Sequence, residues 1–235
     1  MWAFAETPYR EHETPTRGVA KSFHVEDFLA SLFRPQDAFV HAASLNQLDV
    51  VQRWISRHHD VNERDQEGRL ALCAASQNQC LDVLRLLLDS DAHVNLPERD
   101  GKTALHIACT WGRLDAASLL LEHGADSMLR DLEVPVIELS MSGQLPLHAA
   151  CRNGHDRIVE LLLRRRPDVF VADDCGTTPI ELARDWQRRE IMAMLQEYVD
   201  TELRPSMSTH VRFVVKYRCA DLPQSIQAEI CSFLC

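Results

Sequence analysis

The 235-residue chain lacks the features that mark several large classes of protein. No apolar run approaches the roughly 18 to 20 residues that a membrane-spanning helix needs, so we expect no membrane partner. Basic residues number 25 against 35 acidic ones, a net charge of −10. This disfavours nucleic acid as a partner, because phosphate binding needs clustered Lys and Arg. The segment from Met1 to Glu6 has neither the basic start nor the apolar stretch of a secretion signal, so we expect a location in the cytoplasm or nucleus.

The motifs of common catalytic sites are also missing. The sequence contains no Gly-x-x-x-x-Gly-Lys phosphate loop, no Gly-x-Ser-x-Gly elbow, no His-Glu-x-x-His zinc helix and no kinase signature. We therefore expect no enzymatic activity, no cofactor and no metal. The eight cysteines do not indicate a disulfide framework, since Cys73, Cys109 and Cys151 stand beside alanines on expected helices, where a small thiol packs as an apolar group.

Glycine is scarce, but seven of the eight glycines follow one spacing pattern. Gly68, Gly101, Gly143 and Gly176 are separated by 33, 42 and 33 residues, and other glycines follow at fixed distances after them. Glycine is the residue that most readily adopts a positive φ angle. A glycine repeated at a fixed period therefore indicates one turn built several times, and a period of 33 is typical of a solenoid of stacked repeats.

Other residue types repeat in step with the glycines. The segment from Thr103 to His106 is followed by Gly112, a leucine triplet that ends at Leu121, and Gly124-Ala125-Asp126. This pattern resembles the ankyrin repeat, whose signature is Thr-Pro-Leu-His-x-Ala, then Gly-His, a Val-Val pair, a leucine triplet and Gly-Ala-Asp-Val-Asn. The resemblance covers about residues 35–198. It implies an all-α ankyrin-repeat solenoid, in which stacked helix-turn-helix repeats carry short β-turn fingers.

Five repeats are expected within residues 35–199. Asn46, Gln79 and Asp91 stand where a turn glycine is usual. Asn tolerates left-handed turns, whereas Gln79 and Asp91 predict a less regular second repeat. The fifth repeat is rich in polar residues, as expected for a C-terminal cap. The expected repeats are 35–67, 68–100, 101–142 with an insertion at 132–142, 143–175 and 176–199.

Two segments outside the regular pattern carry open alternatives. Residues 1–21 mix Pro, Thr, Glu and Arg without periodicity and are expected to form a disordered arm. Residues 22–34 predict an N-terminal helix whose apolar face either covers the open end of the first repeat or binds a partner. The insertion at 132–142 is apolar for a loop. It either folds back on its finger or presents Val136 and its neighbours to a partner.

The C-terminal extension, residues 200–235, is similar to the SOCS box that follows ankyrin repeats in some ubiquitin-ligase adaptors. That box opens with a helix that binds elongin and ends in a Leu-Pro-rich segment that contacts a cullin. Met207 falls at the opening motif, and Leu222, Pro223 and Ile226 fall at the second. Other positions depart from the pattern, and the connecting stretch is short. The alternative is a structural extension of the repeats.

The resemblance also assigns roles to individual residues. It implies that His106 and His148 bridge neighbouring turns by hydrogen bonds, and that finger tips and inner helices form a concave binding face. Trp111 and Trp186 share one repeat position on that face, and exposed Trp and Arg are enriched at interface hot spots; alternatively, each Trp folds against its own repeat. We expect a monomeric scaffold that binds one or more proteins; the alternative is an adaptor for elongin and a cullin. The candidate protein-binding residues are Trp111, Trp186, Arg69, Arg99, Lys102, Gln77, Asn78, Arg152, Asn153 and Asp174.

Overall fold

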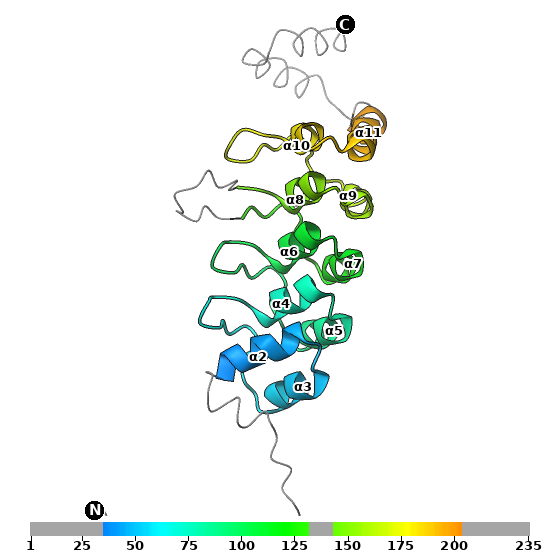
Figure 1. Ribbon diagram of the computed structural model, residues 1–235. Coiled ribbons are helices and arrows are strands. Elements are labelled where there is room, and N and C mark those ends of the chain that lie inside the picture. Colours follow the sequence, from blue (N-terminus) through cyan, green and yellow to red (C-terminus); the bar gives the residue numbers. More distant parts are fainter. Residues whose placement is uncertain (1–34, 132–142, 204–235) are drawn as a thin grey trace, which may run out of the picture.

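The computed structural model describes residues 35–131 and 143–203, which form a stack of five helix pairs (Figure 1). Within these two ranges no strand is present, and a single isolated bridge joins Arg64 to Leu70. The expected all-α repeat solenoid is confirmed. The pairs are α2 (Pro35–Ser44) with α3 (Leu48–Ser56), α4 (Ala71–Asn78) with α5 (Leu81–Asp89), α6 (Ala104–Trp111) with α7 (Leu114–Glu122), α8 (Pro146–Asn153) with α9 (Asp156–Leu163), and α10 (Pro179–Asp185) with α11 (Arg189–Tyr198), which continues into a π-helical turn, η1 (Val199–Leu203).

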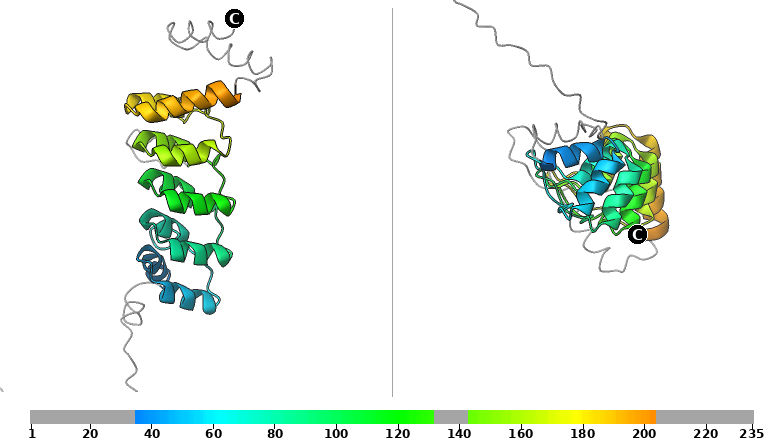
Figure 2. Two further views of the ribbon diagram at one scale, coloured as in Figure 1. Left: turned by 90° about the vertical axis from the view of Figure 1, so that its right-hand side faces the viewer. Right: turned by 90° about the horizontal axis from the view of Figure 1, so that it is seen from below.

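The helices form two layers that run along the stack. The inner layer holds α2, α4, α6, α8 and α10, and each of these packs on the next (Figure 2). The outer layer holds the five partner helices, which are also in contact from one repeat to the next. The fingers project from the inner layer, on the side away from the outer helices (Figure 1).

Small residues inside and leucines outside allow the layers to pack closely. Ala75, Ala108 and Ala150 occupy one register position of successive inner helices and are fully buried. Leu87 and Leu120 do the same in the outer layer. A buried leucine contributes about 1.5–3 kcal/mol relative to an exposed one. Because these side chains are covered by the neighbouring repeat, each repeat depends on the next for its stability.

The periodic glycines all adopt positive φ angles, and so do the residues that replace them. Asn46, Gln79 and Asp91 have φ values of 57°, 58° and 62°. The prediction of a less regular second repeat is wrong, because α4 is eight residues long, as are α6 and α8. The Gln79 and Asp91 side chains are exposed, so no neighbouring residue obstructs them, and the local cost of the left-handed backbone is about 1–2 kcal/mol per residue. The Gln79 amide also donates a 2.8 Å hydrogen bond to Asp115 of the next repeat.

Each finger is closed by a backbone hydrogen bond across its base. The amide of Asp65 donates to the carbonyl of Arg69 at 3.0 Å, and the equivalent bonds in the second and fourth fingers measure 2.8 and 2.9 Å. In the third finger the Asp131 amide donates to the Gln144 carbonyl at 3.0 Å. The insertion therefore begins and ends inside this finger. Residues 132–142 themselves lie outside the described ranges.

The inner-helix cysteines are buried free thiols, as predicted. Cys73, Cys109 and Cys151 are each at most 1% exposed. Burial raises the pKa of all three thiols, which keeps them protonated and unreactive. Cys80 is also buried, and Cys175 is exposed.

The first repeat presents an apolar end to the start of the stack. A cavity of about 720 Å³ is lined by Pro35, Phe39, Val50 and Trp54, together with charged residues such as Arg53. The Phe39 and Trp54 rings are stacked with centroids 4.8 Å apart. In later repeats the positions of Val50 and Trp54 are buried against the preceding helix pair. The helix expected at 22–34 and the arm expected at 1–21 lie outside the described residues.

Candidate functional site

The two motif histidines have structural surroundings. The His106 Nδ1 accepts from the Thr103 amide at 3.2 Å and lies 2.9 Å from its hydroxyl, while Nε2 lies 3.0 Å from the Gln144 carbonyl. The side chain thus ties the start of α6 to the next finger, as the sequence indicated. Burial, which is the main cause, lowers the pKa of His106 to about 4, so its imidazole is neutral at pH 7.

The same position is held differently in the last two repeats. The His148 Nδ1 accepts from the Leu145 amide at 3.1 Å, and burial lowers the pKa of His148 as well. In the fifth repeat Glu181 takes this place, and its carboxylate accepts from the amide and hydroxyl of Thr178, both at 2.7 Å. Both side chains therefore hold the starts of their own helices. The bridge to the next finger that the resemblance implied for His148 is not found, because its buried Nε2 makes no hydrogen bond within the described residues.

The charged candidates on the finger tips are paired with nearby opposite charges. The Arg69 Nε lies 2.8 Å from Asp65 and 3.2 Å from Glu67. The Lys102 Nζ lies 2.7 Å from Asp100. These local pairs compensate the charges of Arg69 and Lys102, whereas Arg99 makes no ion pair within the described residues.

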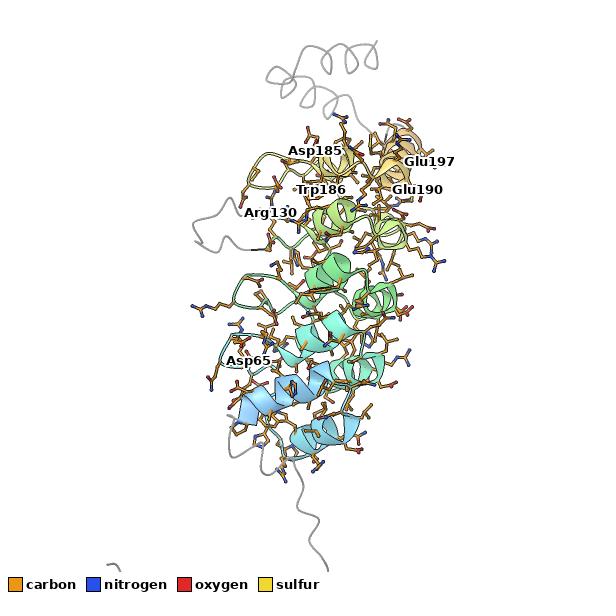
Figure 3. All side chains as sticks on the ribbon, in the orientation of Figure 1. Asp65, Arg130, Asp185, Trp186, Glu190 and Glu197 are labelled. Carbon is orange, nitrogen blue, oxygen red and sulfur yellow. The ribbon has the colours of Figure 1, made fainter. Side chains whose placement is uncertain are left out.

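The two remaining finger candidates also make local contacts. The Asp174 carboxylate lies 3.7 Å from the Arg130 guanidinium, which also donates to the Gly143 carbonyl at 3.1 Å. Figure 3 shows Arg130 and Asp65 on the finger side of the stack. Arg99 is exposed, and its aliphatic stem lies against Gly68 of the preceding finger. A side chain at Gly68 would collide with that stem.

The other candidates gather at the C-terminal ends of the inner helices. Five residues there occupy one register position, separated by 33, 33, 42 and 33 residues, and we call them the inner-helix row. Its three apolar members are half exposed, namely Leu45 at 54%, Trp111 at 53% and Trp186 at 50%. The row consists of Leu45, Asn78, Trp111, Asn153 and Trp186.

Hydrogen bonds between repeats hold the backbone beneath the row. The Arg113 Nε donates to the Gln77 carbonyl at 2.8 Å, and the Arg188 Nε donates to the Arg152 carbonyl at 3.4 Å. The His155 Nε2 lies 3.1 Å from the Thr110 carbonyl and must carry a hydrogen there, because a carbonyl can only accept. The ends of α4, α6 and α8 are therefore each fixed by a residue of the following repeat.

The two asparagines of the row take part in this network. The Asn78 amide nitrogen donates to the Ser44 carbonyl at 2.9 Å, and the Asn153 amide nitrogen donates to the Thr110 carbonyl at 3.1 Å. Because both acceptors are carbonyl oxygens, the orientation of each side-chain amide is determined. The row thus alternates between exposed apolar side chains and asparagines with a fixed orientation.

The structure divides the sequence-based candidates into two groups. Gln77, Asn78, Trp111, Arg152, Asn153 and Trp186 lie in or beside the inner-helix row, whereas Arg69, Arg99, Lys102 and Asp174 lie in the fingers. The tail candidates Met207, Leu222, Pro223 and Ile226 lie outside the described residues.

Two exposed apolar residues did not enter the sequence-based set. Met128 is 39% exposed and Phe170 is 46% exposed. They occupy the register position of Asn62 and Asn95. The side-chain oxygens of these two asparagines accept hydrogen bonds of 2.8 Å from backbone amides of the next repeat. The sequence could have indicated these two positions, because Asn62, Asn95, Met128 and Phe170 are separated by 33, 33 and 42 residues, the spacing of the repeats.

Two kinds of site are absent from the described ranges. No group of three or more His, Cys, Asp or Glu side chains there could hold a metal ion. No helix within residues 35–131 and 143–203 is long and apolar enough to span a membrane.

Comparison with known proteins agrees with this architecture. A family model described as ankyrin repeats (3 copies) matches residues 39–131, and one described as ankyrin repeats (many copies) matches residues 139–183. The chain is 28% identical over 123 residues to ankyrin repeat and SOCS box protein 16 of Homo sapiens, covering 49% of this chain and 23% of that protein. It is 29% identical over 97 residues to the Mus musculus protein of the same name, covering 38% of this chain and 20% of that protein. The matched part of the chain therefore spans about a quarter of these relatives or less.

Proposed function

This chain belongs to the ankyrin repeat family, and we propose that it is a non-catalytic scaffold that binds a partner protein through its concave face. Ankyrin repeats are modules of protein–protein interaction. The observation that supports this particular face is the inner-helix row, which exposes Leu45, Trp111 and Trp186 above a backbone held by hydrogen bonds. A binding surface fixed in advance loses less entropy on association.

The size of the tryptophan contribution follows from its exposed area. An aromatic side chain buries about 150–250 Å² when fully covered, and half of the Trp111 side chain is already covered. Covering the remainder, about 100 Å², is worth at most about 2.5 kcal/mol at 25 cal/mol per Å². We therefore expect Trp111→Ala to weaken partner binding by about 1–3 kcal/mol.

The test begins with affinity purification of partners on the full chain. The dissociation constant of a purified partner is then measured by calorimetry for wild type and Trp111→Ala. Met128→Ala serves as the matched control, because Met128 is also an exposed large apolar side chain but lies outside the inner-helix row. An unchanged dissociation constant for Trp111→Ala, with the melting temperature preserved, would contradict the proposal.

A second candidate function is that of a ubiquitin-ligase adaptor. The observation that favours it is that both named relatives are called ankyrin repeat and SOCS box proteins. In this role Met207 would belong to the elongin-binding helix, and Leu222, Pro223 and Ile226 to the cullin contact. Co-expression with elongin should then yield a complex that Met207→Asp disrupts. Recovery of the full chain without elongin would reject the adaptor role and leave the scaffold proposal intact.

A further inference from the structure

The inner-helix row alternates in chemistry from one repeat to the next. Its first, third and fifth members are the apolar residues Leu45, Trp111 and Trp186, and its second and fourth members are Asn78 and Asn153. We propose that this row binds an extended, uncharged peptide segment of the partner that runs along the stack. The inference rests on the proposed function, because it names the kind of segment that the same face would bind.

The spacing of the row suits an extended chain. Packed helices lie about 8–10 Å apart, so members two repeats apart are separated by about 16–20 Å. An extended strand advances about 3.3 Å per residue, so this distance corresponds to about five to six residues. Because successive side chains of a strand alternate in direction, residues six apart point the same way. Two apolar side chains of the peptide at that separation could contact two apolar members of the row.

Asn78 and Asn153 can supply the hydrogen-bond donors and acceptors that an extended peptide backbone needs. An extended peptide has N–H and C=O groups without partners of its own, and these must be bound when water is removed. The Asn78 and Asn153 amide nitrogens each use one hydrogen on a carbonyl of the preceding repeat. The side-chain carbonyl and the second N–H of each asparagine remain to pair with a peptide main chain.

A helical ligand fits the row less well. A helix satisfies its own backbone groups and presents an apolar residue at every turn, about 5.4 Å apart. Its apolar stripe would lie over Asn78 and Asn153 as well as over the apolar members. The alternation over about 16–20 Å, set by the helix spacing, therefore favours the extended segment.

The lack of charge in the inner-helix row favours an uncharged peptide segment. The row contains no ionisable side chain. The finger cations Arg69 and Lys102 are paired with carboxylates of their own fingers. We therefore expect binding that changes little between low and physiological salt, because salt screens chiefly interactions between exposed charges.

The test uses the full chain and a phage-displayed library of random 16-residue peptides. We expect enriched peptides to carry apolar residues about six positions apart, without a helical pattern. A synthetic copy of one such peptide should bind about tenfold more weakly to Trp111→Ala and to Asn153→Ala, a usual loss at interface hot spots. Met128→Ala is the matched control, because Met128 is an exposed apolar side chain outside the row, and it should leave the affinity within about twofold.

A second measurement leaves the protein unchanged. Single backbone N-methyl groups are placed along the peptide, and we expect about tenfold weaker binding at the positions opposite the two asparagines and small effects elsewhere. Tolerance of N-methylation at every position would overturn the inference, as would enriched peptides that bind as helices. If no peptide is enriched while a folded partner still binds through Trp111, the peptide inference fails and the scaffold proposal stands. If Trp111→Ala affects neither ligand, both fail.

Discussion

His106 makes the stability of the stack depend on pH. Its imidazole is 2% exposed and bridges α6 to the carbonyl of Gln144 in the next finger. Burial is the main cause that lowers its pKa from 6.5 to about 4, and the nearby Lys102 lowers it further. Since the folded pKa lies below the unfolded one, the unfolded chain binds more protons between these values. Stability is therefore fully present above pH 6.5 and is lost as the pH falls toward 4.

The magnitude follows from the two pKa values. Between pH 7 and pH 5, the difference in proton binding removes about 2 kcal/mol, and the full loss near pH 4 is about 3 kcal/mol. His148 adds to this loss because burial lowers its pKa too. Burial raises the pKa of Glu98 and Asp131, which acts in the opposite direction.

The assay is urea unfolding followed by circular dichroism at pH 7, 6 and 5. His106→Gln is the comparison variant, because its side-chain amide can donate and accept hydrogen bonds but does not ionise in this range. We expect the variant to be less stable at pH 7 and to lose about 2 kcal/mol less than wild type between pH 7 and pH 5. Parallel losses in the two proteins would show that His106 ionises normally in the folded state and would refute the reasoning.

Three further predictions concern packing. Gly112→Ala should lower the melting temperature more than Gly124→Ala, because a methyl group at the first site would lie 2.6 Å from the His155 ring whereas nothing lies within 4 Å at the second; equal effects would contradict this. Met128→Asn should raise stability by about 0.5–1.5 kcal/mol in a urea titration, by adding the link between repeats that asparagine makes elsewhere in the stack; a loss would show that the methionine packs more tightly than its exposure indicates. Deletion of residues 22–34 should lower the melting temperature of the first repeat if this segment covers the open cavity, and an unchanged value would reject that role.

Periodic residues predicted most of the fold, because the glycine turns and the buried alanines recur with the same geometry, whereas the histidine bridge is complete at His106 and not at His148. The second repeat was misjudged for a physical reason, since the left-handed angles of Gln79 and Asp91 cost only about 1–2 kcal/mol each and the packed helices tolerate this. The candidate surface was only partly predictable. Register alone assigned Trp111 and Trp186 to one repeat position. The orientation of the asparagines depends on distances between repeats, and the pairing of the finger charges depends on side-chain conformations within each finger; a sequence contains neither.

The hydrogen bond between Asp131 and Gln144 closes a loop of twelve intervening residues, whereas the first finger closes over three. The entropy of closing a flexible loop grows only with the logarithm of its length, so this fourfold extension costs about 1 kcal/mol. The third finger can therefore accept changes of length without disturbing the helices on either side. It is the natural place to graft a foreign epitope or a fluorescent reporter onto this scaffold.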